Sequence, residues 1–113
     1  MWILIMITIT LHFLFDWVLQ PRYIAKSKKT NSDSLFHHMV FNILPFTFIL
    51  GISLVAFFDY EPLNAFFIVG INFISHYLID MFLPSGKNER EMIDWTAIDQ
   101  ILHINILILL LQL

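Results

Sequence analysis

The sequence predicts an all-α polytopic membrane protein, a bundle of four transmembrane helices. Hydrophobic residues make up 58% of the 113 residues and charged residues only 13%, and the mean hydropathy is +0.77. A soluble domain of this size has too little interior to bury so much apolar surface. The apolar residues also fall into four long runs separated by short polar segments, which is typical of membrane-spanning helices.

The first apolar run, residues 2–20, has about the length that crosses a bilayer core of roughly 30 Å. It lacks the features of a cleaved signal peptide, because no basic residue precedes it and no small-residue cleavage motif follows it. His12 and Asp16 lie in its second half, where a signal peptide would be purely apolar. We therefore expect a transmembrane helix that ends at Pro21.

The second run, residues 34–58, is expected to begin at an N-cap provided by Asp33 or Ser34. Pro45 should kink this helix, because proline removes a backbone hydrogen bond and clashes with the preceding turn. The run also carries three polar side chains near its start: His37, His38 and Asn42.

The third run, residues 63–83, follows a short acidic turn, and the fourth, residues 91–113, follows a polar loop. Both carry polar residues at helical spacing inside the apolar stretch: Asn72, His76 and Asp80 in the third, and Asp99, Gln100 and His103 in the fourth. No shift in composition divides the chain. We therefore expect a single transmembrane helical domain over residues 1–113.

Three His–Asp pairs within the apolar runs need an explanation: His12/Asp16, His76/Asp80 and Asp99/His103. Residues four apart lie one above the other on the same face of a helix. An imidazole and a carboxylate placed in this way can hold a cation between them. A carboxylate in hydrocarbon costs about 2.5–3.5 kcal/mol on insertion scales, so these residues are candidates for function.

The basic residues predict the orientation of the chain. They gather in the first and third predicted loops: Arg22, Lys26, Lys28 and Lys29, then Lys87 and Arg90. Basic loops tend to stay in the cytoplasm, so we expect these two loops there and both termini outside. In that topology all three pairs, together with His37 and His38, fall within roughly the cytoplasmic half of the membrane.

Imidazoles and carboxylates from four helices at one depth predict an intramembrane metal site. The predicted ligands are His12, Asp16, His37 or His38, His76, Asp80, Asp99 and His103. Seven donors exceed what one zinc ion needs, and they would suit two metals that share a bridging carboxylate. Cysteine is absent, and ligation without sulfur fits zinc, manganese or iron, with zinc favoured and one or two ions expected. Mutual hydrogen bonding within the pairs and a proton relay are the alternatives.

Further polar residues have two interpretations each. The amides of Gln20, Asn42, Asn72 and Gln100 could orient the metal ligands, or the last three could simply hydrogen-bond between helices. Lys26, and after it Arg22, could hold an anionic headgroup at the membrane surface. The alternative for these two side chains is topological charge in contact with anionic lipid.

Three functions remain open at this point. The first is a metal-dependent hydrolase that acts on a lipid or lipid-linked substrate approached from the cytoplasmic leaflet. The second is a transport or channel protein for protons or divalent cations, although the apolar outer halves of the helices disfavour a conducting path through one bundle. The third is a non-catalytic interaction module stapled by metal. A net charge of −3 gives no reason to expect nucleic acid as a partner, whereas a homo-oligomer stays open.

These motifs together resemble a family of small bacterial and phage integral membrane proteins, domain-of-unknown-function family 3307. The resemblance covers nearly the whole chain and rests on an ordered set: His12-x-x-x-Asp16, Gln20-Pro21, Ala25-Lys26, a His early in the second helix, His76-x-x-x-Asp80 and Asp99-Gln100-x-x-His103. It implies a bacterial inner-membrane location and His38 as the ligand of the second helix. More distantly the chain resembles integral-membrane metal-dependent hydrolases, an analogy that implies hydrolytic chemistry.

Overall fold

The computed structural model describes residues 1–19, 31–84 and 87–112, and within these ranges every regular element is helical. The elements in chain order are α1 (Trp2–Phe13), η1 (Leu14–Val18), α3 (Ser32–His38), η2 (Met39–Ile43), α4 (Leu44–Phe58), α5 (Pro62–Phe82) and α6 (Glu89–Leu111). The π-helical turns η1 and η2 continue their neighbours, so the described chain forms four rods. The all-helical prediction is confirmed.

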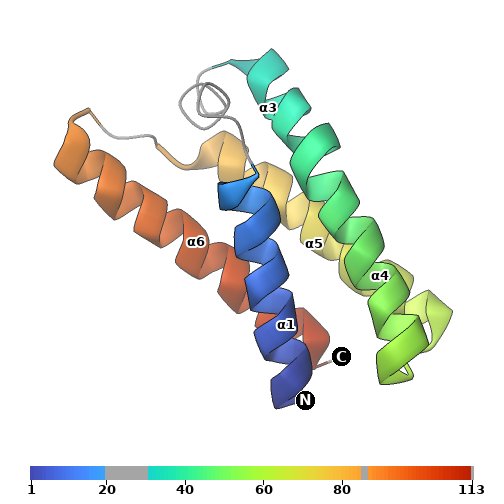
Figure 1. Ribbon diagram of the computed structural model, residues 1–113. Helices are drawn as coiled ribbons and strands as arrows, with labels where there is room; N and C mark the ends of the chain where they lie inside the picture. The colour runs from blue at the N-terminus through green and yellow to red at the C-terminus, as the bar shows by residue number, and fades with distance from the viewer. Residues whose placement is uncertain (20–30, 85–86, 113) are drawn as a thin grey trace.

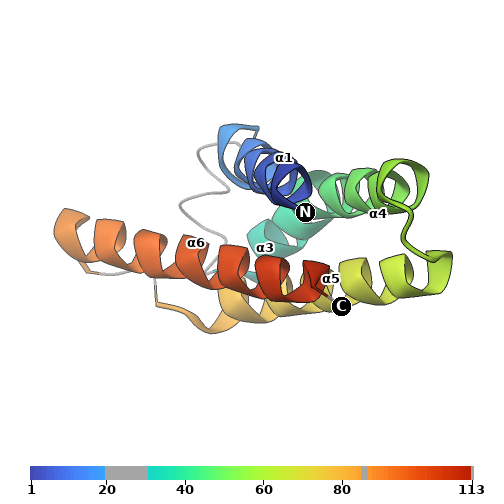
Figure 2. The same cartoon turned by 90° about the horizontal axis from the view of Figure 1, so that it is seen from below.

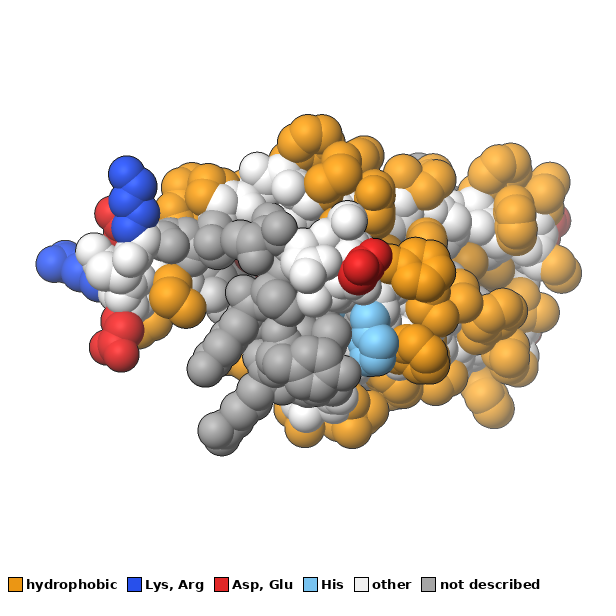
Figure 3. Space-filling view, turned by 90° about the horizontal axis from the view of Figure 1, so that it is seen from above, with side chains coloured by type: hydrophobic (Ala, Val, Ile, Leu, Met, Phe, Trp, Pro, Cys, Tyr) orange, Lys and Arg blue, Asp and Glu red, His pale blue; other side chains and the backbone are white. Residues whose placement is uncertain are grey.

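Three of these rods are long and apolar enough to cross a membrane: Ser32–Phe58, Pro62–Phe82 and Glu89–Leu111. The first rod, Trp2–Val18, is apolar but shorter, and the end expected near Gln20 and Pro21 lies outside the described residues. Large apolar side chains face outward, with Phe57 77% and Phe82 73% exposed. Hydrophobic side chains cover much of the surface in Figure 3. Such a surface indicates a membrane protein.

The four rods pack in two layers. Figure 2 shows α1 and the α3–α4 rod on one side, and α5 with α6 on the other. α5 packs against both α4 and α6, whereas α1 bridges the layers through contacts with α4 and α6. In Figure 1 the N-terminus, the end of α6 and the α4–α5 turn all lie at the same end of the bundle.

The helix ends follow ordinary capping chemistry. Asn31 caps α3 by accepting a hydrogen bond from the Asp33 backbone N–H at 2.9 Å, so the expected cap at Asp33 or Ser34 was wrong. Asp33 instead lies in the first turn, where the helix dipole favours a carboxylate. Asn88 caps α6 in the same way, with its side chain accepting from the Glu91 N–H at 2.9 Å.

The two π-helical turns lie next to candidate ligands. Asp16 lies within η1, and His38 immediately precedes η2, which contains Asn42. Pro45, where a kink was expected, is the second residue of α4, which follows η2 directly. A π-helical adjustment is one way for a helix to accommodate the backbone groups that proline frees.

The interior of the bundle holds a large apolar cluster, a polar centre and a small apolar cluster beside that centre, formed by Leu35, Met39 and Ile43. The apolar core occupies the end that holds both termini: Leu4, Ile5, Phe46, Leu50, Leu54, Ala65, Ile68, Leu107, Leu110 and Leu111. Tyr60, in the α4–α5 turn, donates a hydrogen bond of 2.5 Å to the Leu111 carbonyl. Partial burial raises the pKa of the Tyr60 hydroxyl, which keeps it protonated as a donor. The buried histidines and aspartates lie toward the other end.

Candidate metal centre

The structure buries all the predicted ligands that lie in the apolar runs. None of them is more than 3% exposed: His12, Asp16, His38, His76, Asp80, Asp99 and His103. They come from all four rods, the first two from α1 and η1, the next from α3, and the remaining pairs from α5 and α6. Residues far apart in the sequence therefore meet at one polar centre.

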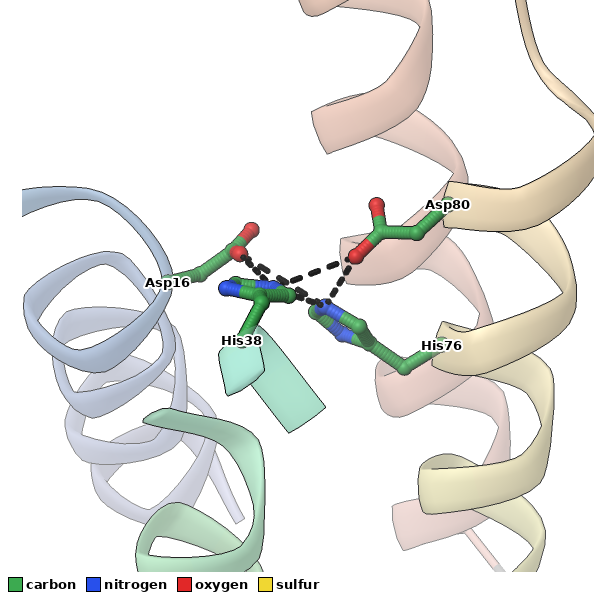
Figure 4. A group of neighbouring side chains, drawn as sticks. All are labelled: Asp16, His38, His76 and Asp80. Atoms are coloured by element: carbon green, nitrogen blue, oxygen red, sulfur yellow. Dashed lines mark hydrogen bonds and ion pairs between the residues drawn. The ribbon is translucent and has the colours of Figure 1, made fainter. Parts of the chain in front are cut away.

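Four of these side chains converge as a group that could hold a metal ion: Asp16, His38, His76 and Asp80. Figure 4 shows the four pointing toward one another from three rods. The His38 Nε2 atom lies 3.0 Å from Asp16 Oδ1 and 3.1 Å from Asp80 Oδ2. The His76 Nε2 atom lies 3.5 and 3.1 Å from the same two oxygens, and 3.3 Å from His38 Nε2.

These separations are close to, and in part slightly shorter than, those of ligands around a small divalent ion. Ligands about 2.0–2.2 Å from a tetrahedral zinc ion lie roughly 3.3–3.6 Å from one another. The five nitrogen–oxygen and nitrogen–nitrogen distances given above run from 3.0 to 3.5 Å. Two nitrogens and two oxygens without sulfur suit zinc, manganese or iron equally well in chemistry.

The two adjacent histidines of α3 have different surroundings. His38 is fully buried in the group, whereas His37 is half-buried and packs against Phe41, with ring centroids 4.5 Å apart and the rings tilted by 35°. The structure thus brings His38, rather than His37, together with the other donors. The roughly 100° turn between neighbouring helical residues produces this difference.

A second group with metal-ligand geometry consists of Asp16, Asp99 and His103. The His103 Nε2 atom lies 3.5 Å from Asp99 Oδ1 and 3.4 Å from Asp80 Oδ1. Asp16 belongs to both groups, so the two donor sets are adjacent rather than separate.

His12 lies beside these groups but belongs to neither. Its Nε2 atom is 3.5 Å from Asp16 Oδ2 and 3.2 Å from Gln100 Oε1. Its ring is tilted against those of His76 and His103, with centroids 5.7 and 5.5 Å away. The position of His12 is that of a residue that orients Asp16 and Gln100.

Gln100 links several members of the centre. Its Nε2 group donates to Asp16 Oδ2 at 2.7 Å and to Asp99 Oδ2 at 3.2 Å, while its oxygen faces His12. Such outer hydrogen bonds hold metal ligands in position. Gln100 therefore contacts Asp16, Asp99 and His12, and its role as an orienting amide stays a prediction.

The other amides behave differently. Asn42 and Asn72 are buried, and Asn42 Oδ1 and Asn72 Nδ2 have no hydrogen-bond partner among the described residues. Each lies four residues, about one helical turn, from a candidate ligand: Asn42 from His38, and Asn72 from His76. Gln20, Arg22 and Lys26 lie outside the described residues.

Thr8 is a buried polar residue that sequence analysis passed over. It is 1% exposed and donates its hydroxyl to the Leu4 carbonyl at 2.7 Å. Its spacing of four residues before His12 was the available signal, since that spacing places both on one face. The backbone contact satisfies the hydrogen-bonding capacity of the buried hydroxyl.

Comparison with curated proteins and with solved structures gives no match. A family model described as "Protein of unknown function (DUF3307)" matches residues 3–113. The match confirms the family resemblance inferred from the ordered His, Asp and Gln motifs. This all-helical chain, with its buried His–Asp centre, belongs to the DUF3307 family.

Proposed function

We propose that the chain is a four-span integral membrane protein that binds a divalent metal and uses it to hydrolyse a lipid or lipid-linked substrate. The observation that carries this proposal is the convergence of Asp16, His38, His76 and Asp80 at separations of a metal's ligands. The substrate would approach from the cytoplasmic leaflet of a bacterial inner membrane.

The membrane placement is supported by the lengths and composition of the rods. Three rods have the length and apolarity of a span, and α1 with η1 adds 17 residues, 12 and 5 respectively. At 1.5 Å per residue that first rod extends about 26 Å, slightly less than a bilayer core of roughly 30 Å. The basic residues of the first and third loops would place those loops, and the polar end of the bundle, in the cytoplasm.

Metal binding explains the centre better than hydrogen bonding within the group. The Nε2 atoms of His38 and His76 face each other at 3.3 Å, and both also face Asp16 Oδ1 and Asp80 Oδ2. An imidazole nitrogen offers only one N–H, which cannot serve two carboxylates and a second nitrogen at once. A cation at the centre of the four atoms satisfies every one of them.

A bound divalent ion would supply a Lewis acid and activate water near neutral pH. This chain's residues would supply its ligands, and Gln100 would hold Asp16 and Asp99 in position. A centre close to one membrane face suits a substrate that keeps its acyl or prenyl chain in the bilayer. Hydrolysis of a lipid ester or lipid-linked phosphate is the reaction that fits this location.

The closed donor set of the four-residue group favours a second candidate function. Four protein ligands complete a tetrahedral zinc site, as in structural sites, whereas catalytic sites keep a position open. The metal could therefore staple α3 and α5 to η1 without catalysis. Transport fits less well, because the other end of the bundle interior is packed with residues such as Phe46, Leu54 and Leu107.

Elemental analysis of detergent-purified protein tests the metal. We expect at least one divalent ion per chain, its loss in His38→Ala, and its retention in His37→Ala, the matched control from the same helix turn. If the wild-type protein is folded but contains no metal, both the proposed hydrolase and the proposed structural role of the metal are overturned. If metal is present, turnover of phospholipid or prenyl-phosphate panels supports the hydrolase. Loss of folding on chelation, without turnover, supports the staple.

A further inference from the structure

We infer that the centre holds a second divalent cation beside the first, bound by Asp99 and His103 and joined to the first through the carboxylates of Asp80 and Asp16. The inference rests on the proposed metal binding and deepens it. The first ion would occupy the His38–His76 group, and the second would lie toward α6. Three observations support this assignment.

The imidazoles of His76 and His103 stack face to face. Their centroids are 3.8 Å apart and their planes differ by 16°. A metal ion bound to an imidazole nitrogen lies close to the plane of the ring. Ions held by two parallel rings are therefore separated by about the ring spacing, and two-metal sites have ions about 3.5–4 Å apart.

The carboxylate of Asp80 reaches across both ring planes. Its Oδ2 atom lies 3.1 Å from His76 Nε2, and its Oδ1 atom lies 3.4 Å from His103 Nε2. The two Nε2 atoms therefore point to the same side of the stack, each toward a different oxygen of one side chain. That arrangement is what a carboxylate bridging two ions requires.

Asp16 makes a similar link from the opposite rod. Its Oδ1 atom lies 3.0 Å from His38 Nε2, while its Oδ2 atom accepts from Gln100, whose Nε2 group also donates to Asp99. Asp16 also has ligand geometry with Asp99 and His103. One residue therefore belongs to both donor sets.

The second position would have fewer dedicated ligands than the first. Asp99 and His103 are its own donors, and among the described residues the bridging carboxylates of Asp16 and Asp80 lie within reach of them. Ions such as Mn²⁺ prefer more ligands than this in octahedral sites, so positions remain for water or a substrate oxygen. The second ion is thus the one that meets the substrate, whereas the first is enclosed by protein.

Stoichiometry and spin coupling of Mn²⁺ test the inference independently of activity. Purified protein is stripped with chelator, reloaded with Mn²⁺ and examined by elemental analysis and electron paramagnetic resonance. We expect two ions per wild-type chain with the spectrum of an exchange-coupled pair. Asp99→Asn and His103→Ala should each keep one ion and show the six-line spectrum of isolated Mn²⁺. Asn105→Ala, an exposed position on α6, is the matched control and should keep both ions.

The possible results separate the two proposals. A single ion in wild type that Asp99→Asn retains and His38→Ala loses would overturn the second ion and leave the proposed metal binding in place. A single ion lost equally in both variants would mean one mixed site and would also overturn the inference. Wild-type protein that binds no Mn²⁺, Zn²⁺ or Fe²⁺ would overturn the inference and the proposed function together.

Discussion

His38 and His76 bring their Nε2 atoms to 3.3 Å although 38 residues separate them in the chain. His38 is the last residue of α3, and His76 lies in the C-terminal half of α5. Neither helix could position the pair alone. The contact depends on the packing of the bundle. Any ion placed between these nitrogens would therefore connect the binding of metal to the folding of the membrane domain.

Removal of metal should lower the stability of the folded protein. A ligand that binds only the folded state stabilises it by about 2.7 kcal/mol when present at 100 times its dissociation constant. We expect the thermal unfolding midpoint of detergent-purified protein to fall on chelation and to recover when Zn²⁺ or Mn²⁺ is restored.

The His38→Ala variant serves as the control for this experiment, because it lacks a central ligand. Its midpoint should already be low and should not respond to chelator or to added metal. An equal response of wild type and variant would show that the metal acts elsewhere on the chain.

Replacement of Gln100 should weaken metal binding without abolishing it. The Gln100 amide contacts Asp16, Asp99 and His12, but it is not in either donor group. Loss of such an outer hydrogen bond typically costs 10–100-fold in metal affinity. We expect Gln100→Ala to raise the dissociation constant for Zn²⁺ by that factor in a competition titration. An unchanged constant would mean that the ligands hold their positions without the amide.

Asn42→Leu should leave metal content unchanged and should not destabilise the bundle. The Asn42 Oδ1 atom is buried and has no hydrogen-bond partner within the described chain, a condition that costs about 1–3 kcal/mol in proteins. An apolar side chain of similar size removes this cost. The measurement is the unfolding midpoint in detergent at a fixed metal concentration. A clear drop in the midpoint would indicate that the amide is bonded, for example to a water or a bound substrate, in the working protein.

Much of the fold follows from the sequence because apolar runs of this length have few alternatives. The polar pattern also indicated which faces turn inward, since residues four apart share a helix face. The π-helical turn at Leu14–Val18 could not be predicted, because it interrupts the regular helical period without a distinct residue signal, whereas the turn at Met39–Ile43 lies just before Pro45, which predicted only an irregularity of unspecified form.

The residues of the candidate centre could be predicted from the sequence, but the contacts among their side chains could not. The stacking of His76 on His103 depends on the rotation of α5 relative to α6 and on side-chain rotamers, neither of which a spacing rule contains. The contacts of Gln100 could not be predicted either, because a buried amide can also hydrogen-bond between two helices away from any metal ligand. His12 shows the converse, since its spacing from Asp16 is the same as in the other pairs but its nitrogen lies outside both donor groups.

The orientation of the chain in the membrane can be tested with single introduced cysteines. The sequence contains no cysteine, so a thiol reagent would label only the introduced residue. Glu61 precedes α5 at the end of the bundle that holds the N-terminus, and Lys87 precedes α6 at the other end; both are exposed. Under the positive-inside rule, Glu61→Cys should react with a membrane-impermeant maleimide in intact cells, whereas Lys87→Cys should react only after permeabilisation. The reverse pattern would place the His–Asp centre near the outer face, and the substrate would then have to come from the outer leaflet.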